Sequence, residues 1–376
     1  GYAYDFIGPG ELLNELDING KELTTRGGAS YKMLWISPVV CKMSVGELRK
    51  IAEIAKAGIT VYGAKPTAGN ELKSDNGEWR KLVDAIWNSG LPNVITPSQN
   101  ANPMKAAGVE KDVEFPENDK INYIHRTTPN GEIYWINNAS DNTAKTSVTL
   151  RAGGKKPEIW HPEDARKEQA SYRTNGSRTT VDLELNPHDA VFIVMHGKAG
   201  ENGHKAAETV QEEVMTLNDN WFVNFEENPG APDEAMFPKL ISYTEHDNAG
   251  IKYFSGTAVY CKEFKMKGKP AKKASYKLHL GKVGNMATVI LNGDTVSTVW
   301  HEPYSVDITG LLRKGINTLR VEVINPWRNR IIGDRQPGTE KRHTYLGYDN
   351  FFDSKSELMP AGLIGPVTII KETTLK

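Results

Sequence analysis

The hydrophobic pattern changes its period part-way along the chain, and this change limits the available folds more than any other feature. Up to about residue 120, apolar residues recur at helical spacing between short apolar runs. From Asn122 onward they alternate with polar residues, as expected for strands with one exposed face. The 376 residues also exceed what one hydrophobic core usually supports. The pattern therefore predicts an α/β part followed by all-β parts.

The first part is predicted to contain a strand-helix-strand unit. Met33–Pro38 is a continuous apolar run of the kind found in buried strands. Ser44–Glu47 has the form of a capping box, in which the serine hydroxyl and the glutamate carboxylate accept the free amides at a helix start. The helix should end at Gly58, and Ile59–Tyr62 resumes as strand. We therefore expect a Rossmann-like or flavodoxin-like α/β layer over residues 1–120.

The rest of the chain is predicted to form two β domains, a small one over residues 121–200 and a jelly-roll β-sandwich over residues 201–376. Val181–Leu185 alternates apolar with acidic residues, which is typical of a half-exposed strand. Asn292-Gly293 separates two strand-like runs and favours a tight hairpin, because both residues adopt positive φ angles at little cost. The polar stretch Lys198–Gln211 suits a linker between the domains.

The charge balance excludes several classes of partner. The 46 basic residues nearly cancel the 47 acidic ones, which argues against nucleic acid or an anionic membrane. No run of about 18 apolar residues is present, so no membrane span is expected. The first residues lack the basic and apolar regions of a signal peptide, so we expect the sequence to begin inside a longer polypeptide. Cys41 and Cys261 fall in different predicted domains, so no disulfide framework is expected.

Several segments resemble known glycoside hydrolases. Four segments resemble the region behind the catalytic barrel of glycoside hydrolase family 106. They are Tyr4–Ile7, Leu34–Val61, His125-Arg126 and Gly131–Asn138. Five further segments resemble the galactose-binding-like jelly roll that is shared by that family and by the sugar-binding domain of family 2. They are Leu280–Val283, Val289–Gly293, Pro303–Thr309, Gly315–Leu319 and Leu363–Val367. Asn325–Asp334 looks like the rhamnosidase version of this jelly roll.

This resemblance implies an inverting α-L-rhamnosidase that acts on plant-type polysaccharide, in the periplasm or secreted from a bacterium. Its acid and base would lie in an upstream (β/α)8 barrel, which this sequence lacks. The chain is therefore expected to be the non-catalytic carboxy-terminal part, with no catalytic residue of its own, and to support that barrel. Two alternatives stay open: a stand-alone carbohydrate-binding protein, and a structural scaffold without a ligand.

Two aromatic segments of the predicted jelly roll are candidates for binding a rhamnose-containing glycan. They place rings beside polar donors, and a pyranose offers both an apolar C–H face and hydroxyl groups. The candidate residues are Trp300, His301, Tyr304, Trp327, Arg328, Asn329 and Arg330. The alternative is that the rings pack in the sandwich, and that Arg328 and Arg330 form an ion-pair network with Asp334 that braces the loop.

The resemblance also suggests Tyr4, Asp5, His125 and Arg126 as residues at the rim of the barrel's cleft, although interdomain polar contacts would explain them too. The densest acidic clusters are expected to be solvated loops; they are Glu226-Glu227, Asp233-Glu234, and Glu245 with Asp247. No motif for an organic cofactor occurs, and the histidine spacing does not suit zinc. Binding of calcium by Asp349 and Asp353, near Tyr348, stays open as a hypothesis, because hard carboxylate oxygens suit this ion.

Overall fold

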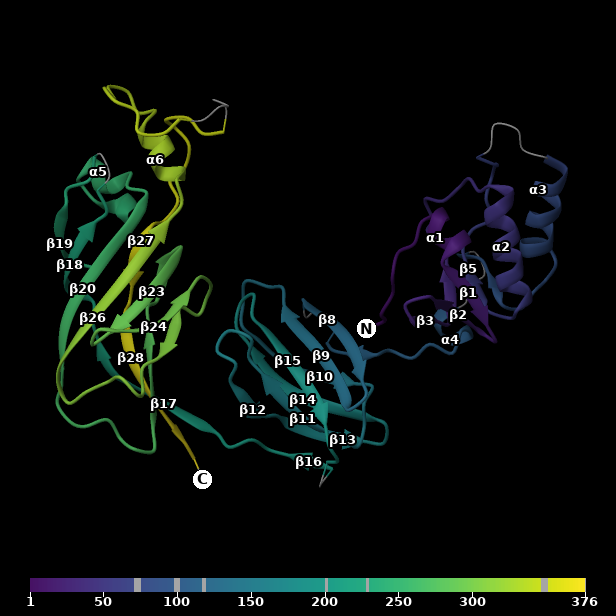
Figure 1. Ribbon diagram of the computed structural model, residues 1–376, viewed down its shortest axis with the longest axis horizontal. Coiled ribbons are helices and arrows are strands. Elements are labelled where there is room, and N and C mark those ends of the chain that lie inside the picture. Colours follow the sequence, from purple (N-terminus) through teal and green to yellow (C-terminus); the bar gives the residue numbers. More distant parts are fainter. Residues whose placement is uncertain are drawn as a thin grey trace. The chain divides into compact units, whose positions relative to one another are not determined.

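The chain is mostly β and divides into two compact units (Figure 1). The computed structural model describes residues 1–70, 76–97, 102–116, 120–199, 202–227, 230–345 and 351–375. The first unit comprises Gly1–Glu114 with Thr149–Arg151, and the second comprises Phe115–Val148 with Ala152–Lys376. Each unit is described by itself. Across the described ranges, no helix has both the length and the apolar character that crossing a membrane requires.

The first unit combines short helices with two small sheets. Its helices are α1 (Pro9–Asn14), α2 (Val45–Lys56), α3 (Asn76–Val83), which continues into a π-helical turn (Asp84–Asn88), and α4 (Pro103–Ala106). One sheet has the order β1-β2-β3, formed by β1 (Leu16–Asn19), β2 (Glu22–Thr25) and β3 (Ser30–Tyr31). The other has the order β4-β5-β6, formed by β4 (Met33–Trp35), β5 (Thr60–Tyr62) and β6 (Val94–Ile95).

The predicted strand-helix-strand unit is present. Helix α2 begins with the expected capping box, in which Ser44 Oγ accepts from the Glu47 amide at 3.2 Å and the Glu47 carboxylate accepts from the Ser44 amide at 2.7 Å. Its apolar face packs against the parallel strands β4 and β5 through Leu48, Ile51 and Ile54, which are fully or almost fully buried. The layer is thus an α/β layer with parallel strands.

The doubly wound order expected for this layer is not confirmed. Rossmann-like and flavodoxin-like sheets contain a point where the strand order reverses. In the residues that the structure describes, β4, β5 and β6 follow one another in chain order without a reversal. The described part of this sheet therefore has the connectivity of two consecutive crossovers, without a switch point.

Two five-stranded sheets lie between residues 113 and 204 of the chain. One sheet has the order β16-β13-β14-β10-β7, formed by β7 (Val113–Glu114), β10 (Ala144–Leu150), β13 (Ser171–Asn175), β14 (Arg178–Leu185) and β16 (Gly203–His204). The other is antiparallel, with the order β12-β11-β15-β9-β8, formed by β8 (Ile121–Thr128), β9 (Gly131–Asn138), β11 (Lys156–Trp160), β12 (Lys167–Gln169) and β15 (Ala190–His196).

The linker predicted over Lys198–Gln211 is partly wrong. Strand β16 pairs with β13 inside that range, and β17 (Thr209–Thr216) begins before its end. The polar composition misled the prediction because both are edge strands, whose side chains remain largely exposed.

The last part of the chain is a β-sandwich, as predicted. Its four-stranded sheet has the order β17-β28-β21-β25, formed with β21 (Ser275–His279), β25 (Ser305–Asp307) and β28 (Thr368–Thr374). Its six-stranded sheet has the order β19-β18-β20-β26-β23-β24, formed by β18 (Asp219–Phe225), β19 (Glu234–Lys239), β20 (Gly256–Met266), β23 (Met286–Leu291), β24 (Asp294–Val299) and β26 (Gly315–Asn325). A further pair is β22 (Lys282–Gly284) with β27 (Gly362–Gly365), and the helices are α5 (Ala249–Lys252), α6 (Arg328–Gly333) and a 3-10 turn (Tyr243–Glu245).

Inward-facing residues of both sheets make the sandwich core. Trp221, Tyr260 and Val321 come from the six-stranded sheet and Leu278 and Ile369 from the four-stranded one, and all are fully or almost fully buried. The predicted hairpin joins β23 to β24, with φ angles of 56° at Asn292 and 93° at Gly293. The positive φ angles at both turn residues are those of the tight turn that the sequence indicated.

Candidate carbohydrate-binding site

Strand register brings the two predicted aromatic segments to the same end of the six-stranded sheet. Ala287, near the start of β23, lies opposite both Val299 at the end of β24 and Val323 near the end of β26. The segments that follow β24 and β26 therefore leave the sheet side by side, two strand spacings or about 10 Å apart. Their first aromatic residues, Trp300 and Trp327, are 62% and 55% exposed.

The segment after β24 offers one open ring and one packed ring. The His301 ring contacts Trp300 edge-on with centroids 5.8 Å apart, and His301 Nδ1 lies 2.8 Å from the Glu302 carbonyl oxygen. Tyr304 is half-buried and packs against the sandwich core. Burial, reinforced by the Glu302 carboxylate, raises the pKa of the Tyr304 hydroxyl. Trp300 is thus the solvent-facing member of this group, whereas His301 is half-buried and its Nε2 lies 3.6 Å from Glu163 Oε1.

The segment after β26 uses most of its polar side chains to organise its own loop. Arg328 donates from Nε and Nη2 to the Glu357 carbonyl oxygen at 3.1 and 2.8 Å, and its guanidinium lies 5.0 Å from the centre of the Phe352 ring. Asn329 is buried, donates to the Met359 carbonyl oxygen at 2.6 Å and accepts from the Met359 amide at 2.8 Å. These hydrogen bonds tie helix α6 to residues 29 and 30 positions further along the chain.

A buried ion pair holds this loop at its base. Arg330 Nε donates to Asp334 Oδ1 at 3.0 Å, and both side chains are almost completely buried. Asp334 Oδ2 also accepts from the amides of His343 and Thr344 at 2.8 and 2.7 Å and from the Thr344 hydroxyl at 2.7 Å. Burial tends to raise the pKa of Asp334, but these hydrogen bonds and Arg330 together lower it. The pair between Arg330 and Asp334 is the bracing contact considered as an alternative to sugar binding, whereas Arg328 bonds elsewhere.

The four residues suggested for a cleft rim lie in two different units. In the first unit, the Tyr4 ring is exposed and contacts Phe6 at 5.3 Å, and Asp5 accepts from the Tyr31 hydroxyl at 2.5 Å. In the second unit, His125 stacks on Tyr134 with ring centres 4.0 Å apart, and its Nε2 lies 3.1 Å from Glu132. Arg126 is exposed and donates to the His125 carbonyl oxygen at 2.9 Å.

The acidic clusters and the metal hypothesis give no further site. The six acidic residues considered are all exposed; they are Glu226, Glu227, Asp233, Glu234, Glu245 and Asp247. Among the residues whose positions are given, no three His, Cys, Asp or Glu side chains gather so that they could hold a metal ion. Asp349 and Tyr348 of the calcium hypothesis lie outside the described residues.

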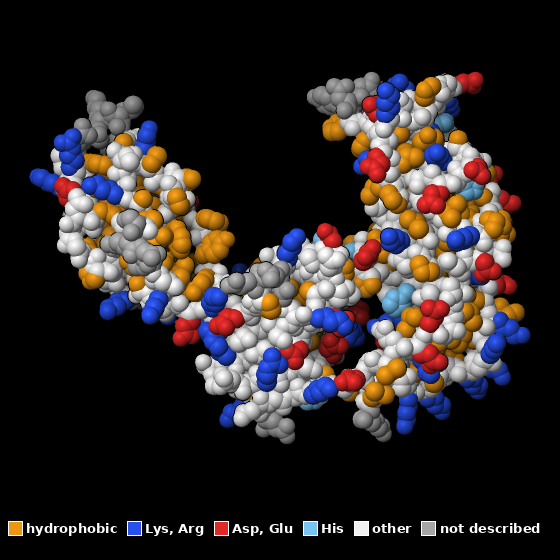
Figure 2. Space-filling view, turned by 180° about the vertical axis from the view of Figure 1, so that it is seen from behind, with side chains coloured by type: hydrophobic (Ala, Val, Ile, Leu, Met, Phe, Trp, Pro, Cys, Tyr) orange, Lys and Arg blue, Asp and Glu red, His pale blue; other side chains and the backbone are white. Residues whose placement is uncertain are grey.

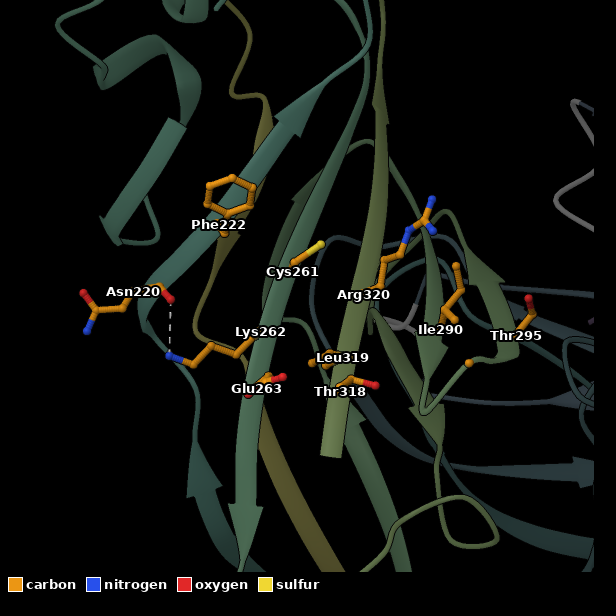
Figure 3. A pocket seen from close by; sticks show the side chains of 11 residues that line it. Asn220, Phe222, Cys261, Lys262, Glu263, Ile290, Thr295, Thr318, Leu319 and Arg320 are labelled. Atoms are coloured by element: carbon orange, nitrogen blue, oxygen red, sulfur yellow. Dashed lines mark hydrogen bonds between the residues drawn. The ribbon is translucent and has the colours of Figure 1, made fainter. Parts of the chain in front are cut away.

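The sequence did not indicate a hollow on the outer face of the six-stranded sheet. Its volume is about 770 Å³, and Phe222, Cys261, Arg320 and Ile290 lie across it (Figure 3). The available signal was the run Trp221-Phe222-Val223, which puts a large ring at a position where two-residue alternation calls for a polar side chain. Both cysteines of the chain are free thiols, and Cys261 lies in this hollow.

Comparison with known proteins shows that the chain is similar to parts of carbohydrate-cleaving enzymes. Residues 1–174 match the glycoside hydrolase family 106 model, described as alpha-L-rhamnosidase, and residues 241–362 match the galactose-binding domain-like model of glycosyl hydrolase family 2. The chain is a homologue of the family 106 glycoside hydrolases.

Two relatives show how much of such a protein this family 106 homologue covers. A putative beta-glucuronidase of Formosa agariphila is 34% identical over 98% of this chain and 53% of its own length. The structure of a rhamnosidase from Novosphingobium sp. PP1Y superimposes with a TM-score of 0.84 and 36% identity, over 98% of this chain and 36% of that one. The chain therefore spans about half the length of the curated relative and about a third of the solved rhamnosidase.

Asp334→Asn is expected to destabilise the second unit of this homologue by about 3–5 kcal/mol, because it leaves the Arg330 charge buried without its partner. Since the folded-state pKa of Asp334 is lowered, its contribution is present above the unfolded value of about 3.9 and is lost as pH falls through the folded value. Urea unfolding at pH 7 and at several pH values below 4 measures both effects. Equal pH dependence in the two proteins would contradict this role.

Proposed function

We propose that this chain is the non-catalytic carboxy-terminal part of an α-L-rhamnosidase and supports a catalytic barrel located elsewhere in the same polypeptide. The coverage of the relatives supports this, because the solved rhamnosidase has nearly two thirds of its length outside the matched region. A (β/α)8 barrel needs eight parallel strands. Within the described ranges, the parallel strands of named sheets are β4, β5 and β6.

Exposed apolar side chains of the first unit carry the proposed support role. Monomeric proteins rarely leave large apolar side chains gathered on one surface unless that surface binds something. Figure 2 shows hydrophobic side chains gathered on one side of this unit. The large exposed hydrophobic residues of the first unit as a whole are Tyr4, Phe6, Ile7, Leu13, Trp35, Val39 and Val40, with Phe6 90% and Val39 84% exposed. We propose that they pack against the barrel.

The reaction class explains why such support would matter. Inverting hydrolysis of a glycosidic bond needs a protonated carboxyl group and a carboxylate about 6.5–9.5 Å apart. Because a displacement of about 1 Å can cost a hundredfold in rate, a barrel benefits from domains that hold its loops in place. The acidic clusters of this chain are exposed and lie in loops or at a strand edge, which fits a supporting role better than a catalytic one.

The proposed substrate is a rhamnose-containing polysaccharide of plant type, and the proposed place of action is the periplasm or the extracellular space. The loop end of the sandwich would hold part of the glycan. Trp300 and Trp327 each expose a ring for stacking on the C–H face of a sugar, and His301 adds a polar group. Asn329 and Arg330 would act by holding the loop, because both are buried.

A second candidate function is carbohydrate binding by the chain alone. The exposure of both tryptophans at one end of a sheet favours it, because sugar-binding surfaces need open rings. This candidate does not require the barrel, so the two functions make different predictions.

Phe6→Asp in the complete polypeptide is expected to lower kcat on an aryl rhamnoside by at least about tenfold, because a carboxylate in the apolar contact would shift the barrel. The measurement is steady-state hydrolysis, with the melting temperature recorded in parallel. Val210→Asp is the matched control, since Val210 is an exposed apolar residue of β17 in the second unit. Full activity of the Phe6 variant would show that this surface does not support catalysis.

Trp300→Ala and Trp327→Ala are each expected to weaken binding of rhamnose oligosaccharides to the chain by about fivefold or more, because each removes a stacking platform. Isothermal titration measures the affinity. Ile124→Ala, which truncates a similarly exposed residue of β8, should bind normally. Unchanged affinity in both tryptophan variants would leave the loop end without a binding role.

A further inference from the structure

The outer face of the six-stranded sheet carries an unusual row of side chains that runs across every strand. Residues opposite one another on neighbouring strands form this row, in the order Met236, Phe222, Cys261, Arg320, Ile290 and Thr295. With neighbouring strands about 4.8 Å apart, the row is about 24 Å long. The row is therefore long enough to follow an extended ligand rather than a single small molecule.

A second row lies two residues away from the first along each strand, or three on β24, where the pairing with β23 contains a bulge, and this row is more polar. Its members are Glu234, Asn224, Val259, Glu322, Thr288 and Thr298. The Thr288 and Thr298 hydroxyls lie 2.8 Å apart, and Arg320 donates to Glu322 at 2.7 Å between the two rows. The face thus has an apolar and aromatic strip bordered by hydroxyl, amide and carboxylate groups.

The first row crosses the hollow of about 770 Å³, a volume in the range of small-ligand sites. In Figure 3, Phe222 and Cys261 lie on one part of the hollow and Arg320, Ile290 and Thr295 on the other. Phe222 is 36% exposed and Met236 is 55% exposed. Cys261 is half-buried. Burial raises the pKa of its thiol, an effect that Arg320 partly offsets.

The charges around the hollow argue against an ionic ligand. Lys262 is tied to Asp219 through the Oδ1 atom at 3.4 Å and through the Asp219 carbonyl oxygen, and Arg320 is tied to Glu322. Both cations lining the hollow therefore already have a carboxylate partner. Glu263 adds a negative charge, which disfavours an acidic ligand. A ligand for this face should be neutral, with apolar patches and several hydroxyl groups.

We propose that this outer face binds a neutral oligosaccharide laid across the strands, with one sugar ring against Phe222 and its hydroxyl groups toward the polar row. The ligand class rests on the proposed function, because carbohydrate is the substrate class of the family. The site is separate from the loop end of the sandwich, where Trp300 and Trp327 lie.

Cys261 gives a direct readout of this face. In a Cys41→Ser variant, Cys261 is the one thiol left in the chain. N-ethylmaleimide labelling at pH 8, followed by intact mass, should slow about tenfold when a neutral tetrasaccharide of α-linked rhamnose is present at ten times its dissociation constant. A uronic-acid-containing oligosaccharide of the same length should protect the thiol much less. An unchanged labelling rate with the neutral tetrasaccharide, or stronger protection by the acidic one, overturns the proposal.

Phe222→Ala separates this site from the others. It should weaken binding of the neutral tetrasaccharide by about tenfold and abolish protection of Cys261, whereas Val210→Ala should change neither. Trp300→Ala should leave the protection of Cys261 intact. If Cys261 is already protected in the complete polypeptide without sugar, another domain covers the face and the proposal is wrong. Rhamnosidase activity of the complete polypeptide without any protection of Cys261 would refute this site alone and leave the proposed function standing.

Discussion

The pairing of strand β26 is the constraint on which most of the sandwich depends. All eleven of its residues, Gly315–Asn325, lie opposite residues of β20 without a shift, and its second half pairs with β23. Because side chains alternate between faces, this register puts Val321 in the core and Arg320 on the outer face. It also fixes where the chain leaves the sheet at Asn325. If β26 were shifted by one residue against its neighbours, its inward and outward side chains would exchange faces. The side chains that form the two candidate sites would then no longer lie together.

Helix α6, which follows β26, fixes the conformation of the loop beyond the sheet. The Arg330–Asp334 pair is desolvated, and such pairs stabilise a fold only when further hydrogen bonds satisfy both partners. Asp334 meets that condition with the amides of His343 and Thr344, so the pair specifies one loop conformation. The exposed Trp327 begins this loop. A costly buried contact beneath an exposed ring fits a surface that has to keep its shape for a ligand or another domain.

Local signals in the sequence predicted the elements whose conformation is decided locally. The capping box at Ser44 and the turn at Asn292-Gly293 formed as expected, because their hydrogen bonds and φ angles involve near neighbours. The strand order of the α/β layer and strand β16 could not be predicted, since pairing partners are chosen by distant segments. For the same reason, the sequence placed Asn329 and Arg330 among exposed sugar-binding groups, whereas both are buried by residues up to 75 positions away.

Under the proposed function, this chain provides support and sugar binding, and another part of the polypeptide carries out the bond-breaking chemistry. Its homology to family 106 and its coverage of about a third of the solved rhamnosidase are the basis for that division. The most direct test is to assay the purified chain alone with an aryl α-L-rhamnoside. We expect no release of rhamnose above the uncatalysed rate. Sustained turnover that co-purifies with the chain would place the catalytic carboxyl groups within these 376 residues and contradict the account.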